Sequence, residues 1–179
     1  MNELSEILAD VMAQIRKAMR EQLAAQGHVM TGKLSESIEY EISVDGTSAV
    51  GRMYMEDYGL VVETGVSAGR IPYGGTGGTK GKTSKYIQGL ITFWEGRGLT
   101  GREAISAAFA TAKVHAKEGM PTRASYAHSS TGERTGFVRT AIENTLEGVG
   151  ELIEKKFGQK LLIDFGENFA GYEKLKLIR

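Results

Sequence analysis

Apolar residues recur every three or four positions over the first part of the chain, which places them on one side of a helix. The pattern predicts a helix over about residues 2–26 that ends at Gly27. Its apolar stripe consists of Leu4, Leu8, Val11, Ile15, Met19 and Leu23. The other side carries Arg16, Lys17, Arg20 and Glu21, and we interpret it as a solvent-exposed face.

From Ser37 the period changes to two, which is typical of a half-buried strand. The apolar positions of this alternation are Ile38, Tyr40, Ile42 and Val44. Asp45-Gly46 indicates a hairpin turn, because these residue types tolerate the positive φ that a type I′ turn needs. A second strand is expected over about residues 49–55.

The next two segments carry weaker patterns. Asp57–Thr64 is expected to form a short helical turn or a further strand, with Leu60, Val61 and Val62 pointing inward and Gly65 ending it in a left-handed conformation. Residues 67–85 are rich in glycine and lack apolar periodicity, so we expect an exposed, mobile loop there.

Helical periodicity returns after the glycine-rich loop and predicts a helical hairpin over residues 86–118. The first helix presents Ile87, Leu90, Ile91 and Trp94; the second, which starts after Thr100, presents Ile105, Ala108, Phe109, Ala112 and Ala116. Gly119 and Pro121 are expected to end this hairpin, and residues 124–133 to form a polar loop.

A last long helix is expected to start near Thr135. Its apolar side consists of Val138, Ile142, Leu146, Val149, Leu152, Ile153 and Phe157. The tail, residues 171–179, has a poor alternation and is expected to form a strand or an extended arm.

Composition narrows the class of protein. A chain of 179 residues suits a single domain, residues 1–179, with one core. Lys plus Arg and Asp plus Glu are balanced at 22 each, so the whole chain has no net charge that would favour DNA or an anionic membrane. Cysteine is absent, the N-terminal segment lacks the pattern of a signal peptide, and no apolar stretch reaches the ~18 residues of a membrane span.

Residues 74–84 come nearest to a catalytic motif. Gly81-Lys82-Thr83 matches the end of a phosphate-binding P-loop, but Thr76 occupies the position of the required first glycine. Leu161–Asp164 imitates the magnesium-binding partner of such a loop within sequence that looks helical. The three histidines, at positions 28, 115 and 128, are scattered singly, without metal-ligand spacing. We therefore expect no catalytic, cofactor or metal site and interpret the chain as not an enzyme.

The lysines of the glycine-rich loop permit two interpretations. Lys80, Lys82 and Lys85 are enough for weak, salt-sensitive contact with DNA phosphates but not for reading sequence. The alternative is an ordinary solvated loop.

Three short segments follow one another along the chain: TGKLSESI (residues 31–38), DYGLVVETG (residues 57–65) and the stretch from GMPTR (residues 119–123) into GFVRTAIEN (residues 136–144). Read in this order, they resemble the tail-completion and neck family of tailed bacteriophages. Matching family positions in the first two segments are Thr31, Gly32, Leu34, Ser37, Ile38, Tyr58, Val62, Glu63 and Gly65. Those further on are Trp94, Gly98, Leu99, Gly119, Pro121, Arg123, Phe137, Arg139, Ala141 and Glu143. Residues 122–136, which separate Pro121 from Phe137, are a departure from the family pattern.

The resemblance implies an α+β fold, in which a small twisted antiparallel sheet is packed by the N-terminal helix, the inserted helical hairpin and a long C-terminal helix. It also implies a virion structural protein that joins head and tail: a homo-oligomeric ring, hexamer or dodecamer, bound to neck, connector or tail-tube proteins. Such a protein is in the host cytoplasm during assembly and then in the virion. The resemblance also implies non-specific contact with DNA in the lumen of the ring, and no membrane partner. We expect the assembly contacts at Arg70, Tyr73, Lys80, Lys82, Lys85, Tyr172, Leu175 and Leu177.

Two alternatives remain open on the sequence. A tail terminator, which caps the tail tube, has a similar size and fold. A P-loop-like nucleotide-binding or nucleic-acid-binding protein would belong to a different class and would depend on Lys82.

Overall fold

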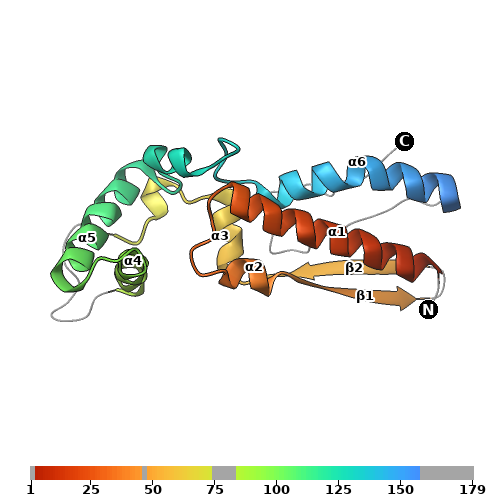
Figure 1. Ribbon diagram of the computed structural model, residues 1–179, viewed down its shortest axis with the longest axis horizontal. Helices are drawn as coiled ribbons and strands as arrows, with labels where there is room; N and C mark the ends of the chain where they lie inside the picture. Colours follow the sequence, from red (N-terminus) through yellow and green to blue (C-terminus); the bar gives the residue numbers. More distant parts are fainter. Residues whose placement is uncertain (1–2, 46–47, 74–83, 158–179) are drawn as a thin grey trace. The chain divides into compact units, whose positions relative to one another are not determined.

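A computed structural model describes residues 3–45, 48–73 and 84–157 (Figure 1). The helices are α1 (Glu3–Ala25), α2 (Lys33–Ser37), α3 (Tyr58–Thr64), α4 (Lys85–Glu95), α5 (Gly101–Glu118) and α6 (Phe137–Phe157). Strands β1 (Glu39–Asp45) and β2 (Ser48–Tyr54) and the 3₁₀ turns η1 (Ala68–Arg70) and η2 (Arg123–His128) complete the described elements. The fold is α+β, as predicted, with a long first helix and a long last one.

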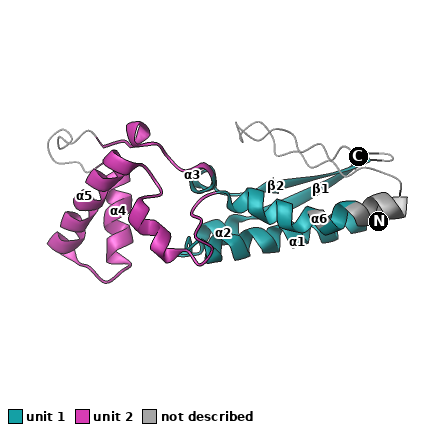
Figure 2. Ribbon diagram, turned by 90° about the horizontal axis from the view of Figure 1, so that it is seen from above, with its two compact units in different colours: residues 1–63, 136–179 teal, residues 64–135 magenta. Residues whose placement is uncertain are grey.

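The chain divides into two compact units (Figure 2). Unit 1 comprises residues 1–63 and 136–179, and unit 2 comprises residues 64–135. Each unit has its own hydrophobic cluster, so the described residues do not share the one core that the chain length led us to expect. The helical hairpin has its own cluster of buried side chains within unit 2.

In unit 1, β1 and β2 form a two-stranded antiparallel sheet in which Glu39 is opposite Tyr54 and Asp45 is opposite Ser48. The predicted second strand is confirmed, and the turn expected at Gly46 lies outside the described residues. One face of the sheet packs on α1. A Cβ atom added to Gly51 of β2 would lie 2.6 Å from Met12 Sδ of α1, so this glycine lets the helix come close to the strand.

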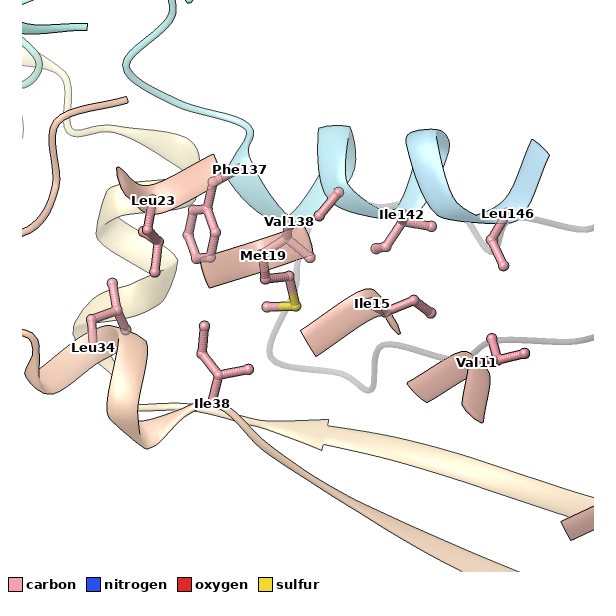
Figure 3. Close-up of a cluster of buried hydrophobic side chains, with 11 residues drawn as sticks. Val11, Ile15, Met19, Leu23, Leu34, Ile38, Phe137, Val138, Ile142 and Leu146 are labelled. Carbon is pink, nitrogen blue, oxygen red and sulfur yellow. The ribbon is translucent and has the colours of Figure 1, made fainter. Parts of the chain in front are cut away.

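The core of unit 1 is formed by α1, α2, the residue Ile38 that joins α2 to β1, and α6 (Figure 3). The predicted stripes contribute Val11, Ile15, Met19 and Leu23 from α1 and Val138, Ile142 and Leu146 from α6, and the close-up shows Phe137 between Leu23 and Val138. Phe137 and Ile38 are fully buried. The buried members of this core are Val11, Ile15, Met19, Leu23, Leu34, Ile38, Phe137, Val138, Ala141, Ile142 and Leu146.

The first segment, residues 31–38, forms a short helix rather than the beginning of a strand. Gly32 has φ 74 and precedes α2, and the strand starts at Glu39, two residues later than its period suggested. Arg20 of α1 holds this junction, since its Nε donates to the Ser35 carbonyl at 2.8 Å and its guanidinium also donates to the Ile38 carbonyl at 3.2 Å. The expectation that Arg20 is simply solvated was therefore wrong.

The second segment, expected to form a helical turn or a strand, forms the helix α3. Gly65 ends it with φ 72, as predicted. Two of the expected inward residues, Leu60 and Val62, are half-buried, whereas Val61 is 42% exposed. The most buried side chain of α3 is instead Glu63, at 3% exposure.

Unit 2 contains the predicted helical hairpin of α4 and α5, whose cluster includes Ile87 and Ile91. On α5 the buried side consists of Ala104, Ala108 and Ala112. Ile105 and Phe109, which we expected on this side, are 43% and 36% exposed. The prediction failed there because the small alanines allow α4 to pack close to α5, which leaves the larger neighbouring side chains outside.

Two segments expected to be loops contain local structure. In residues 67–85, η1 packs against α5 and Ile71 is buried, while residues 74–83 lie outside the described part of the chain. The expected polar loop at residues 124–133 begins with η2. An isolated antiparallel bridge between Val66 and Met120 pairs the two ends of the segment that contains the hairpin.

Candidate functional site

A buried carboxylate links the second and third of the three segments. Glu63 Oε2 accepts a hydrogen bond from Val138 N at 2.8 Å, and Oε1 accepts one from Arg139 N at 3.3 Å. These are N–H groups in the first turn of α6, which have no partner within their own helix. The backbone carbonyl of Glu63 also accepts from Gly136 N at 2.8 Å.

This arrangement replaces an ordinary helix cap. Gly136 precedes α6 with φ 74 and has no side chain that could cap it. A side-chain oxygen at that position normally satisfies the N–H groups of the second or third helical residue. Glu63, 75 residues earlier, supplies that oxygen and places a negative charge at the positive end of the helix dipole.

Burial affects the chemistry of this group. Desolvation raises the pKa of Glu63 above its ordinary value of 4.5, and the hydrogen bonds from the two backbone N–H groups and the charge of Arg139 oppose that rise without cancelling it. A raised carboxyl pKa in a cleft often marks a catalytic acid. Here both oxygens are engaged by the helix terminus, so the contacts of Glu63 are those of a structural cap.

Unit 2 contains a set of partly buried polar contacts between α4 and α5. The Tyr86 hydroxyl lies 2.7 Å from His115 Nδ1, and Trp94 Nε1 donates to Thr111 Oγ1 at 2.9 Å. Burial lowers the pKa of His115 below 6.5, while burial and then the charge of Tyr73 raise the pKa of Tyr86 to about 12. Both groups are therefore neutral near pH 7, and the pairs fix how the two helices pack.

The two units differ strongly in charge. Unit 2 has 10 Lys and Arg against 4 Asp and Glu, a net charge of +6, and unit 1 has 12 against 18, a net charge of −6. The neutral total concealed this difference. The opposite charges can be counted from the sequence, but only once the boundaries of the two units are known.

Three of the ten cations of unit 2 lie along one exposed side of α5, which we call the basic face. Its exposed members are Arg102, Ser106, Phe109, Lys113 and Lys117. They follow one another at steps of four, three, four and four residues, so they share one side of the helix. Alanines at steps of four occupy the buried side. Residues that the structure describes form no ion pair with these three cations.

The outer face of the β1–β2 sheet, turned away from α1, is acidic, and we call it the acidic face. All of its side chains are exposed: Glu39, Glu41, Ser43 and Asp45 on β1, and Ser48, Val50, Arg52 and Tyr54 on β2. Three carboxylates thus accompany one guanidinium. The Tyr54 hydroxyl donates to Glu41 Oε2 at 3.1 Å across the strands.

The contact residues predicted from the sequence do not form one described surface. Arg70 is exposed on η1, Lys85 is exposed at the start of α4, and Tyr73 is half-buried, its ring centroid 6.5 Å from that of Phe109. Lys80, Lys82, Tyr172, Leu175 and Leu177 lie outside the described residues. Reasoning from the sequence named Glu63 as a family position but missed its role as a cap, and it did not single out the basic face or the acidic face as a surface for binding.

The remaining candidates for chemistry can be placed in part. Most of the P-loop-like segment is outside the described residues, and its final residue, Ser84, caps α4 by accepting from Ile87 N at 3.2 Å. The described residues contain no group of three or more His, Cys, Asp or Glu side chains that could hold a metal ion. They also contain no helix long and apolar enough to cross a membrane.

Comparison with known proteins gives no relative: no family model, no curated protein and no solved structure matches the chain.

Proposed function

We propose that this chain is a bacteriophage virion structural protein of the neck or tail completion, which assembles as a ring and joins head and tail. The observation that carries the proposal is the link made by Glu63. The resemblance rests on three short segments, and Glu63 in the second contacts the backbone of Val138 and Arg139 in the third. Segments that belong to one structural motif are expected to meet in this way.

The separation of charge supports assembly of identical copies. In a ring each subunit uses one patch to bind a different patch on its neighbour. The two units of this chain have net charges of −6 and +6, so contact between different units of neighbouring copies would join opposite charges. The ring would be a hexamer or dodecamer and would bind neck, connector or tail-tube proteins in the virion, after assembly in the host cytoplasm. DNA in its lumen would make non-specific contacts, and the mechanism would be recognition without catalysis.

Imaging tests this function directly. The purified protein is examined by light scattering and negative-stain electron microscopy, alone and together with purified phage tails. We expect rings, or additional density at the head-proximal end of the tails. Monomers under both conditions would refute the proposal. Reading frames for a portal and a major capsid protein upstream, and for a tail-tube protein downstream, would be independent support.

A further inference from the structure

We propose that the basic face of α5 binds the acidic face of the β1–β2 sheet in a second copy of the same chain. The inference rests on the proposed function for its expectation that copies associate, and it names the surfaces that meet. The acidic face belongs to unit 1 and the basic face to unit 2, so each copy offers both partners of the contact.

The first argument is complementarity of charge. The basic face carries Arg102, Lys113 and Lys117 with no carboxylate among its members, and the acidic face carries three carboxylates and one guanidinium. Opposite potentials of this kind steer encounter and exclude wrong partners. Exposed ion pairs contribute little affinity individually, so the charges set the choice and register of the partner.

The second argument is the length of the two faces. Arg102 and Lys117 are 15 positions apart on a helix, which is about 22 Å at ~1.5 Å per residue. Glu39 and Asp45 are six positions apart on a strand, which is about 20 Å at ~3.4 Å per residue. Two straight rows of opposite charge therefore have nearly the same length.

The third argument is the apolar surface beside each row of charges. Ile105 and Phe109 are 43% and 36% exposed on α5, and Val50 and Tyr54 are 38% and 48% exposed on β2. Burial of aromatic and aliphatic side chains provides most of the affinity of protein interfaces. Covering these four side chains would provide the free energy that the surface charges lack.

Duplex DNA is the competing occupant of the basic face, because three cations on a helix also suit phosphates. The second copy is favoured because an exposed face of opposite sign and equal length exists on the same chain. DNA would leave the acidic face and its exposed Val50 and Tyr54 unexplained.

A complementation experiment tests the contact. Two double variants are made, Arg102→Glu/Lys113→Glu on the basic face and Glu39→Lys/Glu41→Lys on the acidic face. All four positions are exposed, and circular dichroism checks that each variant is folded. Sedimentation velocity then measures self-association of the wild type, of each variant alone and of an equimolar mixture.

We expect each variant alone to self-associate at least about tenfold more weakly than the wild type, because like charges then face one another. The mixture should regain association, since every contact between the two variants again joins opposite charges. A matched control, Glu95→Lys/Glu143→Lys, changes net charge as much as the acidic-face variant at exposed positions on α4 and α6. It should associate like the wild type.

Five outcomes would overturn the inference. If the wild type forms rings and the two variants do so equally well, the contact lies elsewhere and the ring proposal survives. If the wild type never associates, both proposals fail. If the mixture does not regain association, the two faces are not partners. A monomer whose sedimentation changes with salt would indicate an intrachain contact instead. Binding of a short DNA duplex through Arg102 and Lys113, measured by fluorescence anisotropy, would indicate a DNA contact instead.

Discussion

The Glu63→Ala substitution removes the carboxylate that caps α6. Two backbone N–H groups, those of Val138 and Arg139, then lose acceptors at 2.8 and 3.3 Å. A buried donor without a partner costs about 1–3 kcal/mol, and loss of a helix cap costs about 0.5–2 kcal/mol. These costs describe the same N–H groups and are not added, and the Arg139 bond is long. We therefore expect a loss of about 1–3 kcal/mol in the free energy of unfolding.

Glu63→Gln keeps the shape and one acceptor oxygen, so we expect it to lose less than Glu63→Ala. The pH dependence distinguishes the role of the charge. Because burial raises the pKa of Glu63 above 4.5, the folded state holds the proton more tightly than the unfolded state. The wild type should therefore lose stability relative to Glu63→Gln as the pH rises from about 4.5 through the folded pKa.

Urea denaturation followed by circular dichroism, at pH 7 and at several lower pH values, measures both effects. Glu143→Ala is the control, because Glu143 is exposed on α6, and its expected change is within about 0.5 kcal/mol. If Glu63→Ala were as mild as this control, the cap would not stabilise α6. A difference between wild type and Glu63→Gln that does not vary with pH would refute the assignment of the raised pKa.

Three further predictions concern stability within each unit. Gly65→Ala should destabilise the protein by at least ~1 kcal/mol more than Gly132→Ala in urea denaturation. Both glycines have positive φ, but an added Cβ at Gly65 would lie 2.6 Å from the Met120 carbonyl oxygen, so equal losses would contradict the clash. Phe137→Ala should cost about 3–5 kcal/mol, and a loss below ~1 kcal/mol would contradict its place in the core. Replacing residues 64–135 by a short Gly-Ser linker should leave a cooperatively melting unit 1, because Glu63 O and Gly136 N are already 2.8 Å apart; non-cooperative melting would show that unit 1 needs unit 2.

The spacing of apolar residues predicted the helices and the strand that bury one side. The stripes of α1, α4 and α6 and the alternation in β1 were sufficient, because burial of one face imposes a fixed spacing on apolar residues. The spacing failed on α5, where alanine and larger apolar residues are intermixed. Ile105 and Phe109 are apolar but exposed, and periodicity cannot choose between two adjacent apolar rows.

Glu63 could not be predicted from its neighbours. A glutamate beside Val62 and Thr64 has the composition of a surface position, and its partners are 75 and 76 residues away in sequence. The long-range contact that buries it becomes visible only when α3 and α6 are placed together. The two charged faces were hidden for another reason, because net charge is a sum over the whole chain and the boundaries at residues 63 and 136 are needed to divide it.

Glu63 also accounts for the position at which α6 starts. Residues 122–136 separate Pro121 from Phe137, so the proline is too far along the chain to set the start of α6. The start is set by Gly136, whose positive φ turns the chain and whose N–H donates to the Glu63 carbonyl, and by the Glu63 carboxylate. Since this anchor comes from the residue that precedes unit 2, the chain leaves unit 1 and returns to it at one point. An insertion at that point can differ in length and in charge without disturbing the core of unit 1, because none of the described residues of 64–135 belongs to that core.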